Sequence, residues 1–138
     1  MVHRSRTDKV MKIEELRIGN KVECYCAAMK VVEIGKETVT LVRADKVVTV
    51  HISRIKPIQL TTTKILNFGF KKSDYSDNVY SLKGFDILFG YGYNENEPHW
   101  HQGHDYEKGD GMSCIWKPID YVHQLQNVVF ELTGEELQ

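Results

Sequence analysis

The sequence predicts a small α+β domain with a β-rich first half and a closing helix. Short segments rich in Val, Ile and Thr, divided by turn residues, fill residues 16–60, and β-branched side chains suit a pleated sheet. Residues 121–134 instead place apolar side chains at helical spacing. The chain of 138 residues is the size of one domain with one core.

The first half is expected to fold as an SH3-like small β-barrel or a strongly curled meander. Its strands are short and its turns are tight, and such strands close most economically into a barrel. The expected turns are residues 35–37 and 44–46, and the expected strands are residues 21–29, 31–34, 38–43 and 47–52.

The second half is expected to contain a short helix, further antiparallel strands and a C-terminal amphipathic helix. Thr62 or Thr63 can cap the short helix, and Gly69 ends it. Strands are expected at residues 79–82, 85–93 and 112–119, with a long polar loop at residues 94–111. Asp120 can cap the final helix, whose apolar stripe is Val122, Leu125, Val128, Val129 and Leu132.

The final helix also has a polar face. His123, Gln126 and Asn127 lie within about one turn of each other. Their side chains can hydrogen-bond back to the sheet or outward to a ligand, and the sequence favours the bonds to the sheet.

One folded domain is expected at residues 11–138, after a flexible extension at residues 1–10. Residues 11–60 form its barrel-like half, with a net charge of +3, and residues 61–138 form its helix–strands–helix half, with a net charge of −6. The basic half is too weakly charged to indicate DNA or RNA binding, although such binding is possible.

The composition places the chain among ordinary globular proteins. Its 41% hydrophobic and 27% charged residues argue against fibrous and disordered classes. No segment reaches the roughly 18 apolar residues that cross a bilayer, and the start lacks a secretory signal. A cytoplasmic protein without membrane contact is therefore expected. The three cysteines are an odd number, which favours free thiols.

Four segments carry a resemblance to a known family. They are MKIEELRIGNKV at residues 11–22, IKPIQLT at 55–61, ILNFGF at 65–70 and YVHQLQNVVFELTGEEL at 121–137. Together they resemble a family of small proteins from Bacteroides-type bacteria, their prophages and their phages. The resemblance implies a phage or prophage protein that acts in the host cytosol, with counter-defence among its roles.

The polar loop holds the strongest candidate metal site. His99, His101, His104 and Asp105 could supply imidazole and carboxylate ligands to a divalent metal. Residues 94–111 contain five acidic residues and one lysine, so they favour a cation and repel phosphate. The same pattern also fits a solvated loop without a ligand, or a contact with a protein partner.

A second candidate site would bind a nucleotide-type ligand. Arg43, Arg54 and Lys56 supply positive charge for phosphates. Tyr91, Tyr93 and Trp100 supply aromatic faces on which a base can stack.

The sequence favours a non-enzymatic binding protein without a cofactor, because no phosphate-binding glycine loop, nucleophile elbow or HExxH helix is present. We expect it to sequester a nucleotide-type signal molecule or to bind a host defence protein. One alternative is a metal-dependent hydrolase that uses His99, His101 and His104. Another is a protein-interaction module without a small-molecule ligand. A homo-oligomer is expected in each case.

Overall fold

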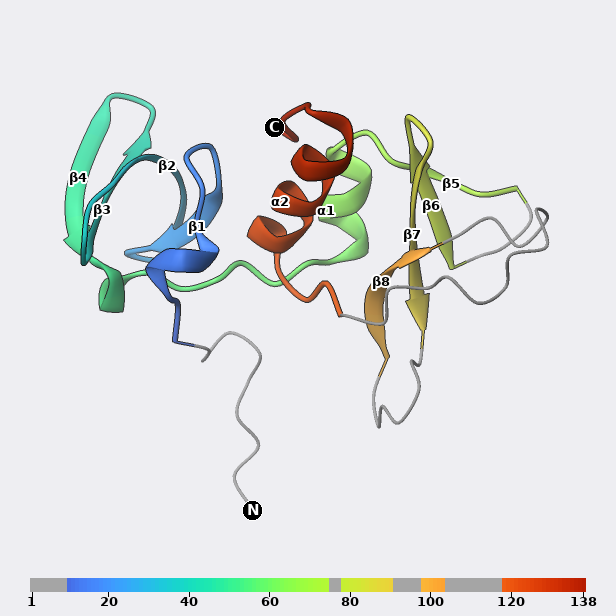
Figure 1. The fold of residues 1–138 in the computed structure, drawn as a ribbon, viewed down its shortest axis with the longest axis horizontal. Coiled ribbons are helices and arrows are strands. Elements are labelled where there is room, and N and C mark those ends of the chain that lie inside the picture. Colours follow the sequence, from blue (N-terminus) through green and yellow to red (C-terminus); the bar gives the residue numbers. More distant parts are fainter. Residues whose placement is uncertain (1–9, 75–77, 91–97, 104–117) are drawn as a thin grey trace, which may run out of the picture. The chain divides into compact units, whose positions relative to one another are not determined.

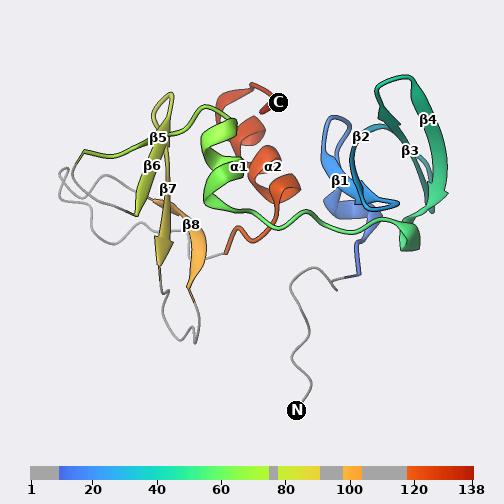
Figure 2. The same ribbon diagram turned by 180° about the vertical axis from the view of Figure 1, so that it is seen from behind.

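The computed structural model describes residues 10–74, 78–90, 98–103 and 118–138. Contacts within the chain divide it into two compact units, Met1–Gln59 with Tyr121–Gln138, and Leu60–Asp120. Figures 1 and 2 show the fold from opposite sides. The chain passes from the first unit to the second near residue 60 and returns near residue 120, so the final helix belongs to the first unit.

The first unit is built on a four-stranded antiparallel meander (Figure 1). Its strands follow in the order β1 (Lys21–Cys24), β2 (Ala27–Ile34), β3 (Thr38–Arg43) and β4 (Lys46–His51). The predictions of a strand at residues 38–43 and a turn at residues 35–37 are confirmed. Among the described strands, β1 and β4 are not paired with each other, so the SH3-like barrel is not confirmed.

The core of this unit lies under the inward face of the meander. Burial alternates along β1 at Val22 and Cys24 and along β3 at Val39 and Leu41. This is the period of two that a half-buried sheet requires. Two 3-10 helices flank the meander, η2 (Ile13–Glu15) and η3 (Ile52–Arg54), and the same core includes Met11, Leu16 and Ile55.

A hairpin interrupts the segment that was expected to be one strand at residues 21–29. Cys24 pairs with Ala27, so Tyr25 and Cys26 form a two-residue loop. Both have positive φ angles, 52° and 60°, which is the backbone of a type I′ turn. Such turns usually contain Asn or Gly, whereas Tyr is common in strands. The residue types at positions 25 and 26 therefore do not indicate a turn.

Helix α2 (Val122–Thr133) belongs to the first unit. It begins after Tyr121, whose backbone N–H donates to the side-chain oxygen of Gln124 at 3.2 Å, and it ends at Gly134 with φ 75°. The N-cap is therefore Tyr121 and not Asp120. Leu132 is exposed, so its place in the predicted apolar stripe is wrong. The buried residues of the helix are Val122, His123, Leu125, Gln126 and Val129.

The second unit combines a short helix with a second antiparallel sheet (Figure 2). Helix α1 (Thr62–Asn67) is capped by Thr61, whose hydroxyl accepts from the backbone N–H of Lys64 at 3.3 Å. The cap thus precedes both predicted threonines, while the predicted end at Gly69 is confirmed by its φ of 99°. The four strands follow in the order β5 (Lys71–Lys72), β6 (Val79–Leu82), β7 (Phe85–Gly90) and β8 (His99–Gly103).

Strand β8 lies inside the segment that was expected to be a loop at residues 94–111. It pairs with β7 from His99 opposite Gly90 to Gly103 opposite Asp86. The loop prediction is wrong there because His-Trp-His-Gln lacks β-branched residues, and the open edge of β7 supplies the partner that makes it a strand. Residues 1–9, 91–97 and 104–117 lie outside the described residues, including most of the strand expected at residues 112–119. No described helix is long and apolar enough to span a membrane.

Candidate functional site

The segment after η3 runs along the outer edge of β1. The Glu23 N–H donates to the Lys56 carbonyl, and the Lys56 N–H donates to the Glu23 carbonyl, both at 2.8 Å. Residues directly opposite in an antiparallel pair project to the same side. Their neighbours Cys24 and Ile55 are buried in the core. The side chains of Glu23 and Lys56 therefore share the outward face.

Arg54 lies on the same edge, close to the tip of the first hairpin. Arg54 ends η3, two residues before Lys56, and Tyr25 follows two residues after Glu23, in the turn of the first hairpin. Burial raises the pKa of the Cys24 thiol, and the charge of Arg54 acts in the opposite direction, as expected for a guanidinium near that thiol. Arg54 therefore lies near Cys24, and Lys56 lies opposite Glu23.

Tyr25 presents its ring at the tip of this hairpin. The residue is 72% exposed. Its left-handed backbone, with φ 52°, costs a residue other than glycine about 1–2 kcal/mol. The fold therefore holds an aromatic residue in solvent with a backbone conformation that glycine or asparagine would adopt more easily.

Two lysines extend the positive charge to the other end of β1. Lys21 and Lys30 are directly opposite in the β1–β2 register, and like charges in such positions repel each other. Both line a cavity of about 220 Å³, whose other lining residues are Gly19, Glu136, Leu137 and Gln138. We call Lys21, Tyr25, Lys30, Arg54 and Lys56 the β1 surface.

The carboxylate of Glu136 is the anionic group of this cavity. It pairs with the guanidinium of Arg17, with Nη2 at 3.0 Å from Oε2. Hydrogen bonding from Arg17 lowers the pKa of Glu136, and the charges of Arg17 and Lys30 act in the same direction. The cavity therefore already surrounds one carboxylate with positive charge.

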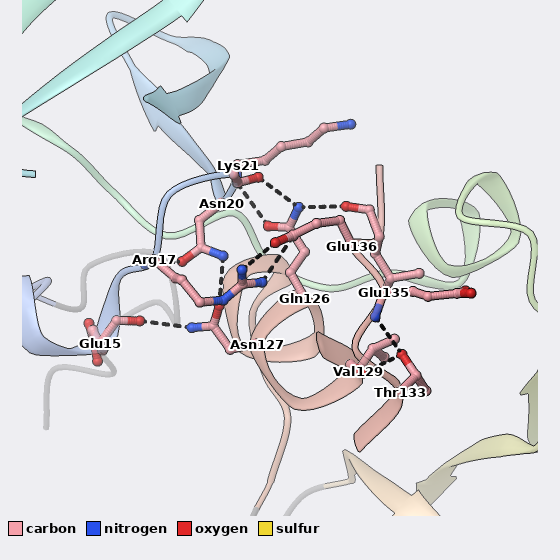
Figure 3. A network of polar contacts seen from close by, with 12 residues as sticks. Glu15, Arg17, Asn20, Lys21, Gln126, Asn127, Val129, Thr133, Glu135 and Glu136 are labelled. Carbon is pink, nitrogen blue, oxygen red and sulfur yellow. Dashed lines mark hydrogen bonds and ion pairs between the residues drawn. The ribbon is translucent and has the colours of Figure 1, made fainter. Parts of the chain in front are cut away.

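Buried Gln126 joins α2 to the start of β1 (Figure 3). Its side-chain oxygen accepts from the Lys21 N–H at 2.8 Å, and its amide donates to the carbonyls of Gly19 at 3.2 Å and Leu137 at 3.1 Å. In Figure 3 the Lys21 side chain extends away from this network. The backbone of Lys21 is thus held by α2, while its side chain lies outside this network.

Further contacts belong to this network. The Asn127 side chain accepts from the Asn20 amide at 2.7 Å. The Arg17 guanidinium carbon lies 3.9 Å from the centroid of the Phe130 ring, a cation–π contact. The predicted bond from the polar face of α2 to the sheet is therefore confirmed for Gln126, whereas Asn127 bonds to Asn20, just before β1, and to the carbonyl of Glu15 in η2.

The predicted cations fall into two separate places. Arg54 and Lys56 lie at β1, as described. Arg43 lies at the turn between β3 and β4, where its backbone is opposite that of Lys46 in the strand register. The length of β4 separates this turn from η3, about 17 Å for five steps along a strand. Arg43 is therefore not part of the β1 surface.

The predicted aromatic residues do not form a described stacking site. Trp100 is 4% exposed and packs edge-on against Tyr80 and in a tilted contact with Phe89, with ring centroids 5.6 and 4.9 Å away. Its faces are therefore used in packing. Tyr91 and Tyr93 lie outside the described residues.

Two of the four predicted metal ligands are described. His99 Nδ1 is 2.6 Å from Asp120 Oδ1, and the rings of His99 and His101 have centroids 6.4 Å apart. His104 and Asp105 lie outside the described residues. Within the described part of the chain, no group of three or more His, Cys, Asp or Glu is arranged to hold a metal ion. That part does not supply the ligand set that the hydrolase alternative requires.

Tyr25 and Lys21 were missed from the sequence. The alternation of Lys21 and Glu23 with buried Val22 and Cys24 is the signal that could have placed Lys21 on the outward face of β1. The unrecognised hairpin concealed the pairing of Lys21 with Lys30.

Compared with known proteins, the chain matches no protein-family model, no curated protein sequence and no solved structure. Its function is therefore inferred from the chemistry of the site.

Proposed function

We propose that this protein is a non-enzymatic binding protein that captures a nucleotide-type anion on its β1 surface. The observation that carries the proposal is the pairing of Lys56 with Glu23, because it places the exposed Lys56 at the edge of β1, the strand that leads into the hairpin with exposed Tyr25. This function retains Arg54 and Lys56 from the sequence prediction and assigns the stacking role to Tyr25.

The chemistry of the β1 surface suits this ligand class. Arg and Lys donate charge-assisted hydrogen bonds to phosphate oxygens. An aromatic ring stacks on a nucleobase, and each such contact is worth about 1–3 kcal/mol. The charged residues around β1 include Lys21, Lys30, Arg54 and Lys56 against the carboxylates of Glu23 and Glu136, so positive charge exceeds negative charge. A phosphate with an attached base meets both requirements.

The same pairing supports an SH3-like architecture for the first unit, which we propose as part of this interpretation. After β4 the chain makes the 3-10 helix η3 and then a bridge to β1. A short fifth segment next to the first strand is the connection that would close a meander of this kind toward a barrel.

The resemblance of the chain ends to small phage and prophage proteins supplies the proposed biological use. A protein that holds a signal nucleotide without consuming it lowers the free concentration of that signal. We propose counter-defence by such sequestration in the host cytosol.

Calorimetric titration with pApA, the 5′-phosphorylated dinucleotide of adenosine, tests the function. We expect Arg54→Ala with Lys56→Ala to weaken binding at least tenfold, and Tyr25→Ala to weaken it about tenfold through lost stacking. Arg43→Ala is the matched control, because it removes an exposed arginine at the distant turn, and it should change affinity less than twofold.

Two results would contradict the function. One is the absence of pApA binding, and the other is equal weakening by Arg43→Ala and by the β1 variants. Mass spectrometry of the recovered pApA tests the non-enzymatic part, because a binding protein returns the dinucleotide intact and a hydrolase does not.

A further inference from the structure

Strand β4 is the open edge of the first sheet. The strand order is β1-β2-β3-β4, so β4 is hydrogen-bonded to β3 on one side (Figure 1). The edge at β1 is met by the chain after η3, where Glu23 and Lys56 exchange two backbone hydrogen bonds. Among the described residues, the other side of β4 has no such partner.

The strand register identifies the hydrogen-bonding groups on this open side. The Ile52 N–H donates to the Glu37 carbonyl at 2.8 Å, one step beyond the β3–β4 register. Hydrogen-bonded and non-hydrogen-bonded pairs alternate in an antiparallel ladder. The backbone N–H and C=O groups of Val47, Thr49 and His51 therefore point away from β3.

This edge lacks the features that usually prevent strands from pairing. Proteins blunt an open edge with proline, a β-bulge or charged side chains along the strand. The sequence of β4 is KVVTVH, and its register with β3 is continuous from Lys46 to His51. Val47 is 64% exposed. Such an edge favours the addition of another strand.

A second copy of β4 is complementary to this edge. In an antiparallel pair with Thr49 opposite Thr49, Val47 of each copy is opposite His51 of the other. Every outward residue then meets an outward residue, and each pair exchanges two backbone hydrogen bonds. The Thr49 hydroxyl lies 2.9 Å from that of Thr40, so the pairing extends a row of threonines across both copies, and threonine pairs across strands are favourable.

The charges at the ends of β4 also suit an antiparallel pair. Lys46 begins the strand, and the Glu37 carboxylate lies beside its other end, 4.0 Å from His51 Nε2. Within one chain these two ends are about 17 Å apart, the length of five steps along a strand. Antiparallel pairing brings Lys46 of each copy to the end that carries Glu37 of the other, and opposite charges across strands are favourable.

We propose that β4 pairs with β4 of a second copy of this chain, which gives a two-fold symmetric dimer whose sheet continues from one copy into the other. This inference goes beyond the proposed function and does not depend on it, because β4 and β1 are at opposite edges of the sheet. Pairing through one strand edge buries little surface, so we expect a dissociation constant in the micromolar range.

Sedimentation equilibrium of the full chain, at concentrations from about 1 to about 500 µM, measures the dimer. The parent protein should pass from one chain to two over this range. Thr49→Lys should weaken association at least tenfold, because it places two lysines opposite each other on the two-fold axis. Thr40→Lys is the matched control. It removes the same threonine pair and adds the same charge, but on β3, and it should change association less than threefold.

An exchange of the end charges tests the antiparallel direction. Lys46→Glu alone and Glu37→Lys alone should each weaken association several-fold. The variant with both changes should return to within twofold of the parent dissociation constant, because the opposite charges meet again between copies. Circular dichroism of each variant checks that the fold is intact.

Three results would overturn the β4 dimer. One is a parent protein that stays monomeric at the highest concentration. Another is equal weakening of association by Thr40→Lys and Thr49→Lys. The third is a double charge variant that associates no more tightly than either single reversal.

Discussion

Gln126→Leu should lower the free energy of unfolding by about 2 kcal/mol. Gln126 is 0% exposed, and its side chain makes three hydrogen bonds, to the Lys21 N–H and to the carbonyls of Gly19 and Leu137. Leucine has a similar volume, so the change removes the hydrogen bonds without opening a large cavity.

The magnitude follows from the groups left behind. The buried Lys21 N–H left without its partner costs about 1–3 kcal/mol of stability. Each of the two longer bonds, to the carbonyls of Gly19 and Leu137, contributes about 0.5–1 kcal/mol, so the total loss of stability is about 3 kcal/mol. Burying an apolar side chain in place of the amide returns about 1 kcal/mol. The difference is a net destabilisation of about 2 kcal/mol.

Urea unfolding followed by far-UV circular dichroism measures this change. With a denaturant dependence of about 2 kcal/mol/M, the midpoint should fall by about 1 M. Leu132→Gln makes the reverse exchange at an exposed position of the same helix, and it should stay within about 0.5 kcal/mol of the parent protein. The reasoning is refuted if Gln126→Leu is as stable as the Leu132→Gln control.

Three other predictions concern the hairpin tip and the Arg17–Glu136 pair. Cys26→Gly should raise the free energy of unfolding by about 0.5–1 kcal/mol, because glycine adopts the left-handed backbone freely. Tyr25→Gly should raise the free energy of unfolding by a similar amount but lower the affinity for pApA. Urea unfolding measures the first effect and calorimetric titration the second. Exposed Cys26 should react with iodoacetamide at least tenfold faster than Cys24, which is buried and whose pKa is raised by that burial; equal rates in peptide mapping would contradict this assignment. The pKa of Glu136 is lowered below its ordinary value of 4.5, chiefly by the Arg17 hydrogen bond, so the pair should stabilise the fold above that pH and lose its contribution as the pH falls through the lowered pKa. Glu136→Gln should flatten this part of the stability profile, and an unchanged profile would show that the pair contributes nothing.

Much of the fold could be predicted from local patterns. The strand at residues 38–43 alternates inward Val39 and Leu41 with outward polar residues, and its period of two specifies the buried face. The short helix and its end at Gly69 follow from a threonine cap and a left-handed glycine. These features depend on residues within a few positions of each other, so one sequence contains their signals.

Other features could not be predicted in this way. Strand β8 has a weak local preference for β structure and exists because β7 offers it a ladder of hydrogen bonds. The burial of Trp100 follows from the same pairing. The candidate site also depends on pairing, because Lys56 reaches Glu23 only when the chain beyond β4 returns to β1.

By itself, the sequence determined the α+β class, the positions of most elements and the presence of cations at Arg54 and Lys56, because propensity, periodicity and capping act over short distances. Only the tertiary structure decided that Lys21 lies opposite Lys30, that Lys56 lies opposite Glu23 and that α2 joins the first unit. Such neighbours are set by backbone hydrogen bonds between residues distant in the sequence, as in the two bonds between Glu23 and Lys56. Backbone N–H and C=O groups are the same in every residue except proline, so the sequence does not mark which of them will pair.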